Sequence, residues 1–314
     1  MKIRELGGEF KLIERIARPA KDPRVICGIG DDAALIRVDR GVQIVTTDML
    51  VEGDHFSRAY FTPRQIGIKA MEINVSDIAA MGGTPTYALI AIALLRNTDV
   101  EFVDGLYEGI YAVADRYGID VIGGDTTHGA VVAISVTLMG EAHQEHPCLR
   151  SGARPGDHIF VSGELGGSQA GLRLFLCGID GFDDVKRKHT EPSARLDISR
   201  EVAGYVTAME DVSDGLASEV RNICRASGCG AVINADQVPI APRVREAAKA
   251  VSGDALEYAL FGGEDFELVY TVPPEFTGRA PGSCVGEVND TKVITIRQGG
   301  EELTLEGSGY DHFA

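Results

Sequence analysis

Apolar residues recur every three or four positions between residues 63 and 81, a spacing that predicts one side of an α-helix. The positions that share this side are Ile66, Ala70, Ile73, Ala80 and Met81. Pro63 after Thr62 marks a start for this helix, and the tandem Gly82-Gly83 marks its end. Asp77 lies on the same side, where an unpaired carboxylate would be costly to bury. It therefore either caps a local break in the helix or meets a cation.

Strand-like runs and helices alternate along the rest of the chain, but several strands follow one another directly. A strand is predicted over residues 42–47, closed by Asp48, and another over residues 85–95. A helix is predicted over residues 99–117, before Gly118. This order favours an α+β fold in which each domain is a mixed sheet with helices packed on it.

Length and composition limit the class of protein. A chain of 314 residues favours two domains, and the Gly-, Pro- and Arg-containing segment 148–157 divides it into residues 1–147 and 148–314. The net charge of -17 argues against a nucleic-acid partner. No C-x-x-C pair, signal peptide or apolar run long enough to span a bilayer is apparent. We expect a soluble, cytoplasmic protein with no membrane partner.

Acidic residues recur where apolar runs end, beside small residues. They are Asp31, Asp32, Asp48, Asp77, Asp125, Asp211 and Asp214. Any one of them alone would be explained as a helix cap or a turn former. Carboxylates that gather repel one another unless a cation joins them, and hard oxygen ligands favour Mg²⁺ or Ca²⁺ over zinc. Because no EF-hand pattern is present, Mg²⁺ shared with phosphate oxygens is the favoured interpretation.

Glycine-rich turns are predicted beside these acids and suit close approach of phosphate to the backbone: GIGDD, GGDTT, GELGGSQAG and GGED. Neither the Walker pattern nor G-x-G-x-x-G is present, so a P-loop and a dinucleotide site are disfavoured. Arg150 and Arg154 either pair with phosphates or are solvated linker residues. His55 either contacts a substrate or ends a strand. No residue stands out as a covalent nucleophile, and none is assigned as catalytic.

With these residues in view, the chain resembles the thiamine-monophosphate kinases, in the superfamily that also holds aminoimidazole ribonucleotide synthetase, selenophosphate synthetase and a hydrogenase maturation protein. The resemblance runs nearly end to end. The motifs that carry it are GEFKLI (8–13), GIGDDAA (28–34), TTDMLVEGDHF (46–56), NVSDIAAMGG (74–83), GGDTT (123–127), RSGARPGD (150–157), DVSDGL (211–216), GGEDFEL (262–268) and GYDHF (309–313).

The resemblance implies that ATP phosphorylates thiamine monophosphate to thiamine diphosphate, the last step of thiamine diphosphate biosynthesis. It also implies a homodimer through the N-terminal sheets, with the C-terminal domain completing the ATP and substrate sites. Several Mg²⁺ ions would be held by Asp32, Thr46, Thr47, Asp48, Asp77, Asp125, Asp211 and Asp214. ATP would be contacted by Tyr107, Gly124, Asp125, Arg150 and Ser213. The thiamine substrate would be contacted by His55, Glu264 and Tyr310.

Two other functions stay open at this point. One is an ATP-dependent member of the same superfamily that acts on a different phosphate or amide substrate. The other is a non-catalytic, acidic metal-binding or scaffold protein. Composition and spacing alone support only a protein that handles phosphate with Mg²⁺, and the substrate side of the site separates the alternatives.

Overall fold

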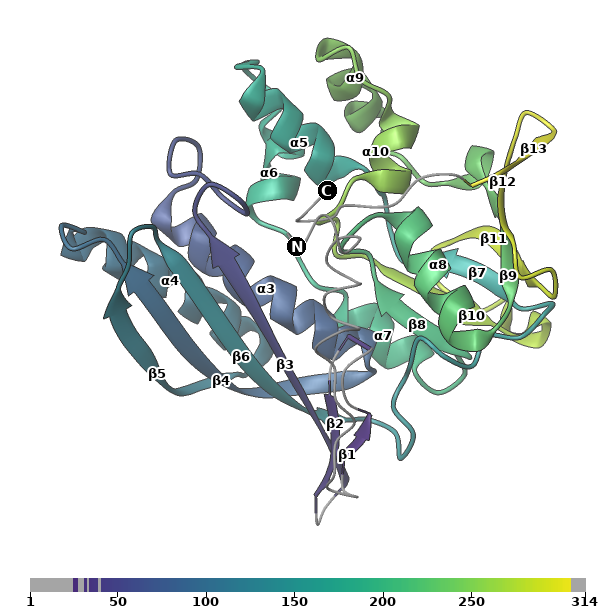
Figure 1. Ribbon diagram of the computed structural model, residues 1–314, viewed down its shortest axis with the longest axis horizontal. Coiled ribbons are helices and arrows are strands. Elements are labelled where there is room, and N and C mark those ends of the chain that lie inside the picture. Colours follow the sequence, from purple (N-terminus) through teal and green to yellow (C-terminus); the bar gives the residue numbers. More distant parts are fainter. Residues whose placement is uncertain (1–24, 28–30, 33, 39–40, 306–314) are drawn as a thin grey trace, which may run out of the picture.

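The computed structural model describes residues 25–27, 31–32, 34–38 and 41–305, which form two mixed sheets with helices packed on them (Figure 1). The first sheet has the order β1-β2-β3-β6-β4-β5, with β4 and β5 parallel and the other neighbours antiparallel. Its strands are β1 (Val25–Cys27), β2 (Ala34–Val38), β3 (Gly41–Val51), β4 (Gly83–Leu94), β5 (Asp120–His128) and β6 (Ala133–Ala142). The predicted α+β class is confirmed.

The second sheet has the order β13-β12-β9-β11-β7-β10-β8, and only its β9–β12 pair is parallel. Its strands are β7 (His158–Val161), β8 (Ala208–Asp211), β9 (Gly230–Asn234), β10 (Leu268–Val272), β11 (Ser283–Asn289), β12 (Ile294–Gln298) and β13 (Glu301–Thr304). The helices of this half are α5 (Gly167–Leu176), α6 (Asp183–Thr190), α7 (Leu196–Val202), α8 (Leu216–Ser227), α9 (Pro242–Ala250) and α10 (Ala255–Phe261), with 3-10 turns η1 (Ala235–Gln237) and η2 (Pro274–Phe276).

The chain passes from the first sheet to the second between the end of β6 and the start of β7. The predicted junction, residues 148–157, lies in this interval. Where the domain boundary falls within it stays a prediction.

Helix α3 (Pro63–Ala80) lies between the two halves and is the helix predicted between residues 63 and 81. Thr62 caps its first turn in a capping box with Gln65, and 14 of its 18 residues are buried. The helix contacts β3, β4 and β6 on one side and β8 and α7 of the other half. It is continuous through Asp77, so that residue does not cap a break.

Helix α4 (Val100–Tyr117) packs against α3 at a very short distance, because glycines face each other where the two helices cross. A Cβ on Gly67 would lie 2.0 Å from the carbonyl oxygen of Leu106. A Cβ on Gly109 would likewise lie 2.0 Å from the carbonyl oxygen of Arg64. Contacts this short exclude any side chain at either position unless the helices move apart.

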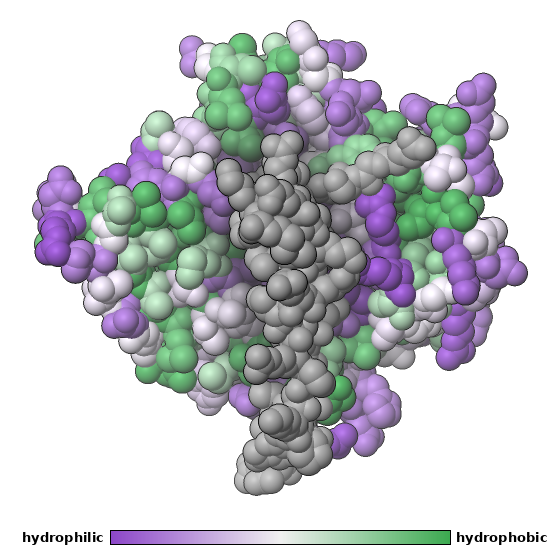
Figure 2. Space-filling model, viewed as in Figure 1, coloured by the Kyte–Doolittle hydropathy of each residue, from purple (hydrophilic) through white to green (hydrophobic). Residues whose placement is uncertain are grey.

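Two details of the first sheet differ from the sequence prediction. Strand β3 continues three residues beyond Asp48, and the GGDTT stretch lies inside strand β5 rather than in a turn. Helices α3 and α4 lie behind this sheet in Figure 1. The opposite face, which we call the open face, exposes apolar side chains such as Met49 and Tyr87, and Figure 2 shows green patches over this half.

The structure also bears on the membrane prediction. Within residues 41–305, no helix combines the length and the apolar composition needed to cross a bilayer.

Candidate active site

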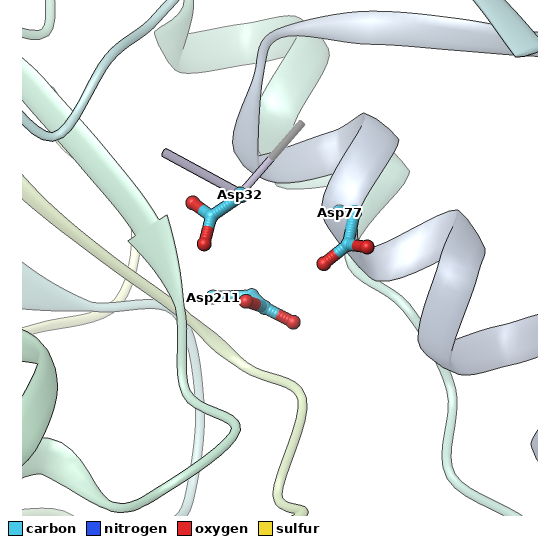
Figure 3. Close-up of side chains that lie close together, drawn as sticks. All are labelled: Asp32, Asp77 and Asp211. Atoms are coloured by element: carbon cyan, nitrogen blue, oxygen red, sulfur yellow. The ribbon is translucent and has the colours of Figure 1, made fainter. Parts of the chain in front are cut away.

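Three carboxylates from distant parts of the chain meet at the junction between the two halves (Figure 3). Asp32 precedes β2, Asp77 lies in the last turn of α3, and Asp211 ends β8. Each offers an oxygen, and these oxygens lie within 4.8 Å of one another. The structure therefore brings these three of the predicted metal ligands together, and their binding of a metal stays a prediction.

Neighbouring polar groups hold the trio in place. The Thr46 hydroxyl donates a hydrogen bond to Asp77, and the Ser76 hydroxyl donates to Asp211 Oδ2 at 2.6 Å. Asp48 alternates with Thr46 along β3 and therefore faces the same side of the sheet. Its backbone N–H donates to Asn74 Oδ1 at 3.2 Å, and its carboxyl is hydrogen-bonded to Asp77.

Burial and mutual repulsion make this cluster electrostatically unfavourable without a cation. Burial, with repulsion from Asp48, Asp211 and Asp32, raises the pKa of Asp77 well above its usual range. Burial also raises the pKa of Asp211 to about 6. Burial raises the pKa of Asp32 to about 8 despite the attraction of Arg150. A divalent cation fits such a set of hard oxygen donors.

Asp32 gives a second sign that a ligand belongs here. Its Oδ2 atom is buried and has no hydrogen-bond partner among the described residues. An unpaired buried carboxylate oxygen is costly, and a metal ion beside it would remove that cost.

Arg150 is a cationic side chain that pairs with this cluster, and it is not a solvated linker residue. Only 18 % of its side chain is exposed. Its guanidinium binds Asp32, and its Nε lies 3.0 Å from Glu210 Oε1. This placement beside the acids suits the predicted contact with a phosphate.

The turn after β8 brings Ser213 and Asp214 beside Asp211. The Ser213 carbonyl accepts a hydrogen bond from the Glu264 backbone N–H at 2.7 Å. The Asp214 backbone N–H donates to Glu219 Oε1 at 2.7 Å. These two bonds fix the turn from both sides, so its position next to the acids is well defined. The ATP contact of Ser213 and the metal contact of Asp214 stay predictions.

Thr47 and Asp125 lie away from this cluster, on the open face of the first sheet. Thr47 alternates with Thr46 and Asp48, and its hydroxyl lies 3.0 Å from that of Thr137. Asp125 on β5 is the register partner of Ala91 on β4, Ala91 is that of Ser135 on β6, and Ser135 is that of Met49 on β3. Partners in register point to the same side of a sheet, so all four lie on the open face. The structure therefore does not bring Thr47 and Asp125 to the carboxylate trio within one chain, and their metal role stays a prediction.

The other two predicted ATP contacts have separate surroundings. Gly124 has a φ of 152°, and a Cβ there would lie 1.8 Å from the Ile90 carbonyl oxygen, so glycine is required for the strand pairing. Tyr107 lies on α4, with its ring centroid 6.0 Å from that of Tyr111. Neither position touches the acid cluster in a contact that the structure records, so both ATP contacts stay predictions.

A second group of side chains surrounds Glu264, one of the predicted substrate contacts. Lys69 Nζ lies 2.6 Å from Glu264 Oε1 and donates to the His55 carbonyl oxygen at 3.0 Å. His189 Nδ1 lies 3.1 Å from Glu264 Oε2. The backbone of His55 and the side chain of Glu264 thus share Lys69, and the substrate contacts of both residues stay predictions. The third predicted substrate contact, Tyr310, lies outside the described residues.

Sequence reasoning missed Lys69, His189 and the buried acids behind Arg150. Lys69 carried a signal, since it lies among apolar residues of the helix predicted between residues 63 and 81. Glu210 and Glu219 are each 1 % exposed and share Asn222 Nδ2, at 3.0 and 3.1 Å. Nothing in the sequence marked these two glutamates, because their partners are distant in the chain.

Comparisons with known proteins identify the family of the chain. The family model for AIR synthase related protein, N-terminal domain, matches residues 30–142, and that for the C-terminal domain matches residues 154–294. Among curated proteins, the thiamine-monophosphate kinase of Aquifex aeolicus is 37 % identical, covering 100 % of both chains. That of Bacillus subtilis is 38 % identical, covering 97 % of this chain and 99 % of the relative.

Solved structures give the same result. The structure of AaThiL complexed with AMPPCP and TMP has a TM-score of 0.90 and 34 % identity, covering 100 % of this chain and 99 % of that one. A structure of the hydrogenase maturation protein HypE has a TM-score of 0.76 at 19 % identity, which shows a shared fold alone. From the two family models and the full-length relatives, the chain belongs to the AIR synthase related family and, within it, to the thiamine-monophosphate kinases.

Proposed function

We propose that this protein transfers the γ-phosphate of ATP to thiamine monophosphate, giving thiamine diphosphate and ADP in a Mg²⁺-dependent reaction. The observation that carries the proposal is the trio Asp32, Asp77 and Asp211, whose carboxylate oxygens converge within 4.8 Å. Kinship supports the choice of substrates, since relatives at 37 and 38 % identity are thiamine-monophosphate kinases and AaThiL was solved with AMPPCP and TMP.

The residues that would hold Mg²⁺ are the trio together with Thr46, Asp48 and Asp214. Bound there, Mg²⁺ would neutralise charge on phosphate oxygens and so reduce the repulsion between donor and acceptor. Arg150, already paired with Asp32, adds a rigid planar donor that suits bidentate contact with a phosphate. The turn at Ser213 lies against the same acids and can present its hydroxyl to the nucleotide.

The reaction needs positioning more than proton transfer. The acceptor is a phosphate monoester, whose second pKa of about 6 leaves it largely dianionic near neutral pH. One of its oxygens can attack the γ-phosphorus of ATP in line while the bond to ADP breaks, with no phosphorylated enzyme. No strong general base is required, and we assign no catalytic side chain.

We infer a homodimer through the open face of the N-terminal sheet, where Met49, Tyr87 and other apolar side chains are exposed. The predicted contacts at Thr47, Tyr107, Gly124 and Asp125 would then belong to a site completed across that interface. In this scheme residues 1–147 bind ATP and Mg²⁺ and dimerise, while residues 148–314 complete the ATP and substrate sites.

The test is turnover of the purified protein with ATP, Mg²⁺ and thiamine monophosphate, with ADP and thiamine diphosphate separated by chromatography. We expect equal amounts of both products and none with EDTA. Asp48→Asn should lower kcat by at least about 100-fold with the fold intact, since removing one electrostatic group at a phosphoryl-transfer site costs this order. The matched control is Asp115→Asn, on the exposed side of α4.

Other outcomes separate the alternatives. ATP binding without formation of thiamine diphosphate would indicate that the protein acts on the substrate of another member of the superfamily. Divalent-cation binding without ATP binding, seen as a thermal shift with Mg²⁺ alone, would favour a metal-binding scaffold. Wild-type turnover by the Asp48→Asn variant at saturating Mg²⁺ would refute the metal assignment.

A further inference from the structure

Glu264 is held by a lysine that has no access to solvent. The Lys69 side chain is 0 % exposed, and its Nζ reaches Glu264 Oε1 at 2.6 Å and the His55 carbonyl oxygen at 3.0 Å. The ring centroid of Phe61 lies 5.4 Å from the same Nζ. A buried ammonium is stable only when paired, so Lys69 and Glu264 fix each other's positions.

His189 holds the other oxygen of Glu264. Its side chain is 3 % exposed, and Nδ1 lies 3.1 Å from Glu264 Oε2 and 3.1 Å from Ser168 Oγ. Burial and the charge of Lys69 lower the pKa of His189, so the ring is neutral near pH 7. Its Nε2 atom is buried and has no hydrogen-bond partner among the residues that the structure describes.

The backbone around Glu264 is strained and is held by several bonds. Glu264 and Phe266 both have positive φ, 66° and 51°, which is uncommon for residues with a side chain. Between them, Asp265 accepts hydrogen bonds from the Gly166 N–H at 2.6 Å and the Ser168 N–H at 3.0 Å. The Glu264 N–H donates to Ser213 O. Strained conformations that many contacts maintain are found mainly at ligand sites.

The exposure of the three side chains shows what this arrangement presents. Lys69 and His189 are buried, whereas the Glu264 side chain is 28 % exposed. Burial raises the pKa of Glu264, but attraction from Lys69 and the bond from His189 outweigh this and lower it to about 2. Each carboxylate oxygen can accept more than one hydrogen bond, so Glu264 keeps acceptor capacity on its exposed side.

We propose that Lys69 and His189 are positioning residues that hold the Glu264 carboxylate as a fixed acceptor for an N–H donor of the substrate. This inference rests on the proposed function, which supplies thiamine monophosphate as the ligand. A purely structural ion pair between α3 and the loop after α10 would not need an exposed carboxylate or a strained backbone at Glu264. The proposal explains both, and it links α3, which also carries Asp77, to the substrate side of the site.

The experiment measures KM separately for thiamine monophosphate and ATP, together with calorimetric binding of thiamine monophosphate without ATP. The variants are Lys69→Met, Glu264→Gln and the double variant, with Lys249→Met as an exposed-lysine control on α9. We expect Lys69→Met to weaken the binding of thiamine monophosphate roughly tenfold to a hundredfold, the range for losing a charge-assisted hydrogen bond. KM for ATP should stay within about twofold of the wild-type value. The double variant should be no weaker than Glu264→Gln, because Lys69 acts through Glu264.

The histidine is tested by a matched pair. His189→Phe removes both ring nitrogens and should weaken the binding of thiamine monophosphate. His189→Gln keeps a hydrogen-bond donor for Glu264 and should bind thiamine monophosphate nearly as tightly as wild type. This pair decides the question if Lys69→Met does not fold. Equal losses for ATP and thiamine monophosphate, additive effects in the double variant, or binding within twofold of wild type in His189→Phe would overturn the inference. Wild-type protein that makes no thiamine diphosphate and binds no thiamine monophosphate would instead refute the proposed function.

Discussion

Replacing Asp77 with asparagine should stabilise the metal-free protein while weakening its response to Mg²⁺. Two unit charges 4.8 Å apart repel by about 3.5 kcal/mol at an effective dielectric constant of about 20. Because the raised pKa values mean that the cluster already binds protons at neutral pH, we expect a smaller net gain, about 1–2 kcal/mol. The asparagine oxygen can still accept the hydrogen bond from Thr46, so the variant loses charge but little else.

The assay is urea unfolding of wild type and Asp77→Asn in EDTA and in saturating Mg²⁺. Wild type should gain about 2.7 kcal/mol when Mg²⁺ reaches one hundred times its Kd, and the order of the two proteins should then reverse. Activity should fall by at least about 100-fold in the variant. An Asp77→Asn protein that is less stable than wild type in EDTA, or that keeps the full Mg²⁺ response, would refute the assignment of Asp77 as a metal ligand.

Three further perturbations test separate parts of the structure. Burial raises the pKa of Asp32 to about 8, so the folded metal-free protein binds a proton there that the unfolded chain has already released. The free energy of unfolding in EDTA should therefore fall as the pH rises from about 4 to about 8. The rise in Tm caused by Mg²⁺ should grow over the same window, and a flat Mg²⁺ response would contradict this. Gly67→Ala should lower the free energy of unfolding by about 2–4 kcal/mol, because the new Cβ would lie 2.0 Å from the Leu106 carbonyl oxygen. An unchanged Tm would show that α3 and α4 can move apart at no cost. Arg150→Met should lower the free energy of unfolding in EDTA by about 3 kcal/mol, because it leaves Asp32 and Glu210 unpaired, and it should also raise KM for ATP. Wild-type values of both quantities would refute the roles of Arg150 in stability and in nucleotide binding.

Local signals predicted the elements well, because they are written in neighbouring residues. Thr62-Pro63 at the start and Gly82-Gly83 at the end bracketed α3 to within two residues. The same local reasoning failed for GGDTT, which was predicted as a turn on its glycines and is instead part of an edge strand. There the pairing with β4 decides the conformation, and a single sequence does not display that pairing.

The site was predicted only as far as repeated aspartates could indicate it. Their number suggested a common cation, and Asp32, Asp77 and Asp211 do converge. Alternation along β3 places Thr47 on the face opposite Thr46, whereas the face that Asp125 occupies depends on its pairing with β4, which its motif does not display. Glu264 lies in the loop after α10 and its partners lie on α3 and α6, so only the folded chain brings Lys69 and His189 to it.

The burial of α3 on both sides has a consequence for how the protein can be divided. One continuous apolar core contains residues of the first sheet and, from the second, Phe160, Met209 and Tyr270. A fragment ending near residue 147 would therefore leave one flank of α3 in water, and the complementary fragment would leave an apolar sheet face bare. The two halves are consecutive segments of the sequence, but the stability of each depends on contact with the other. Neither is expected to keep its shape without the other.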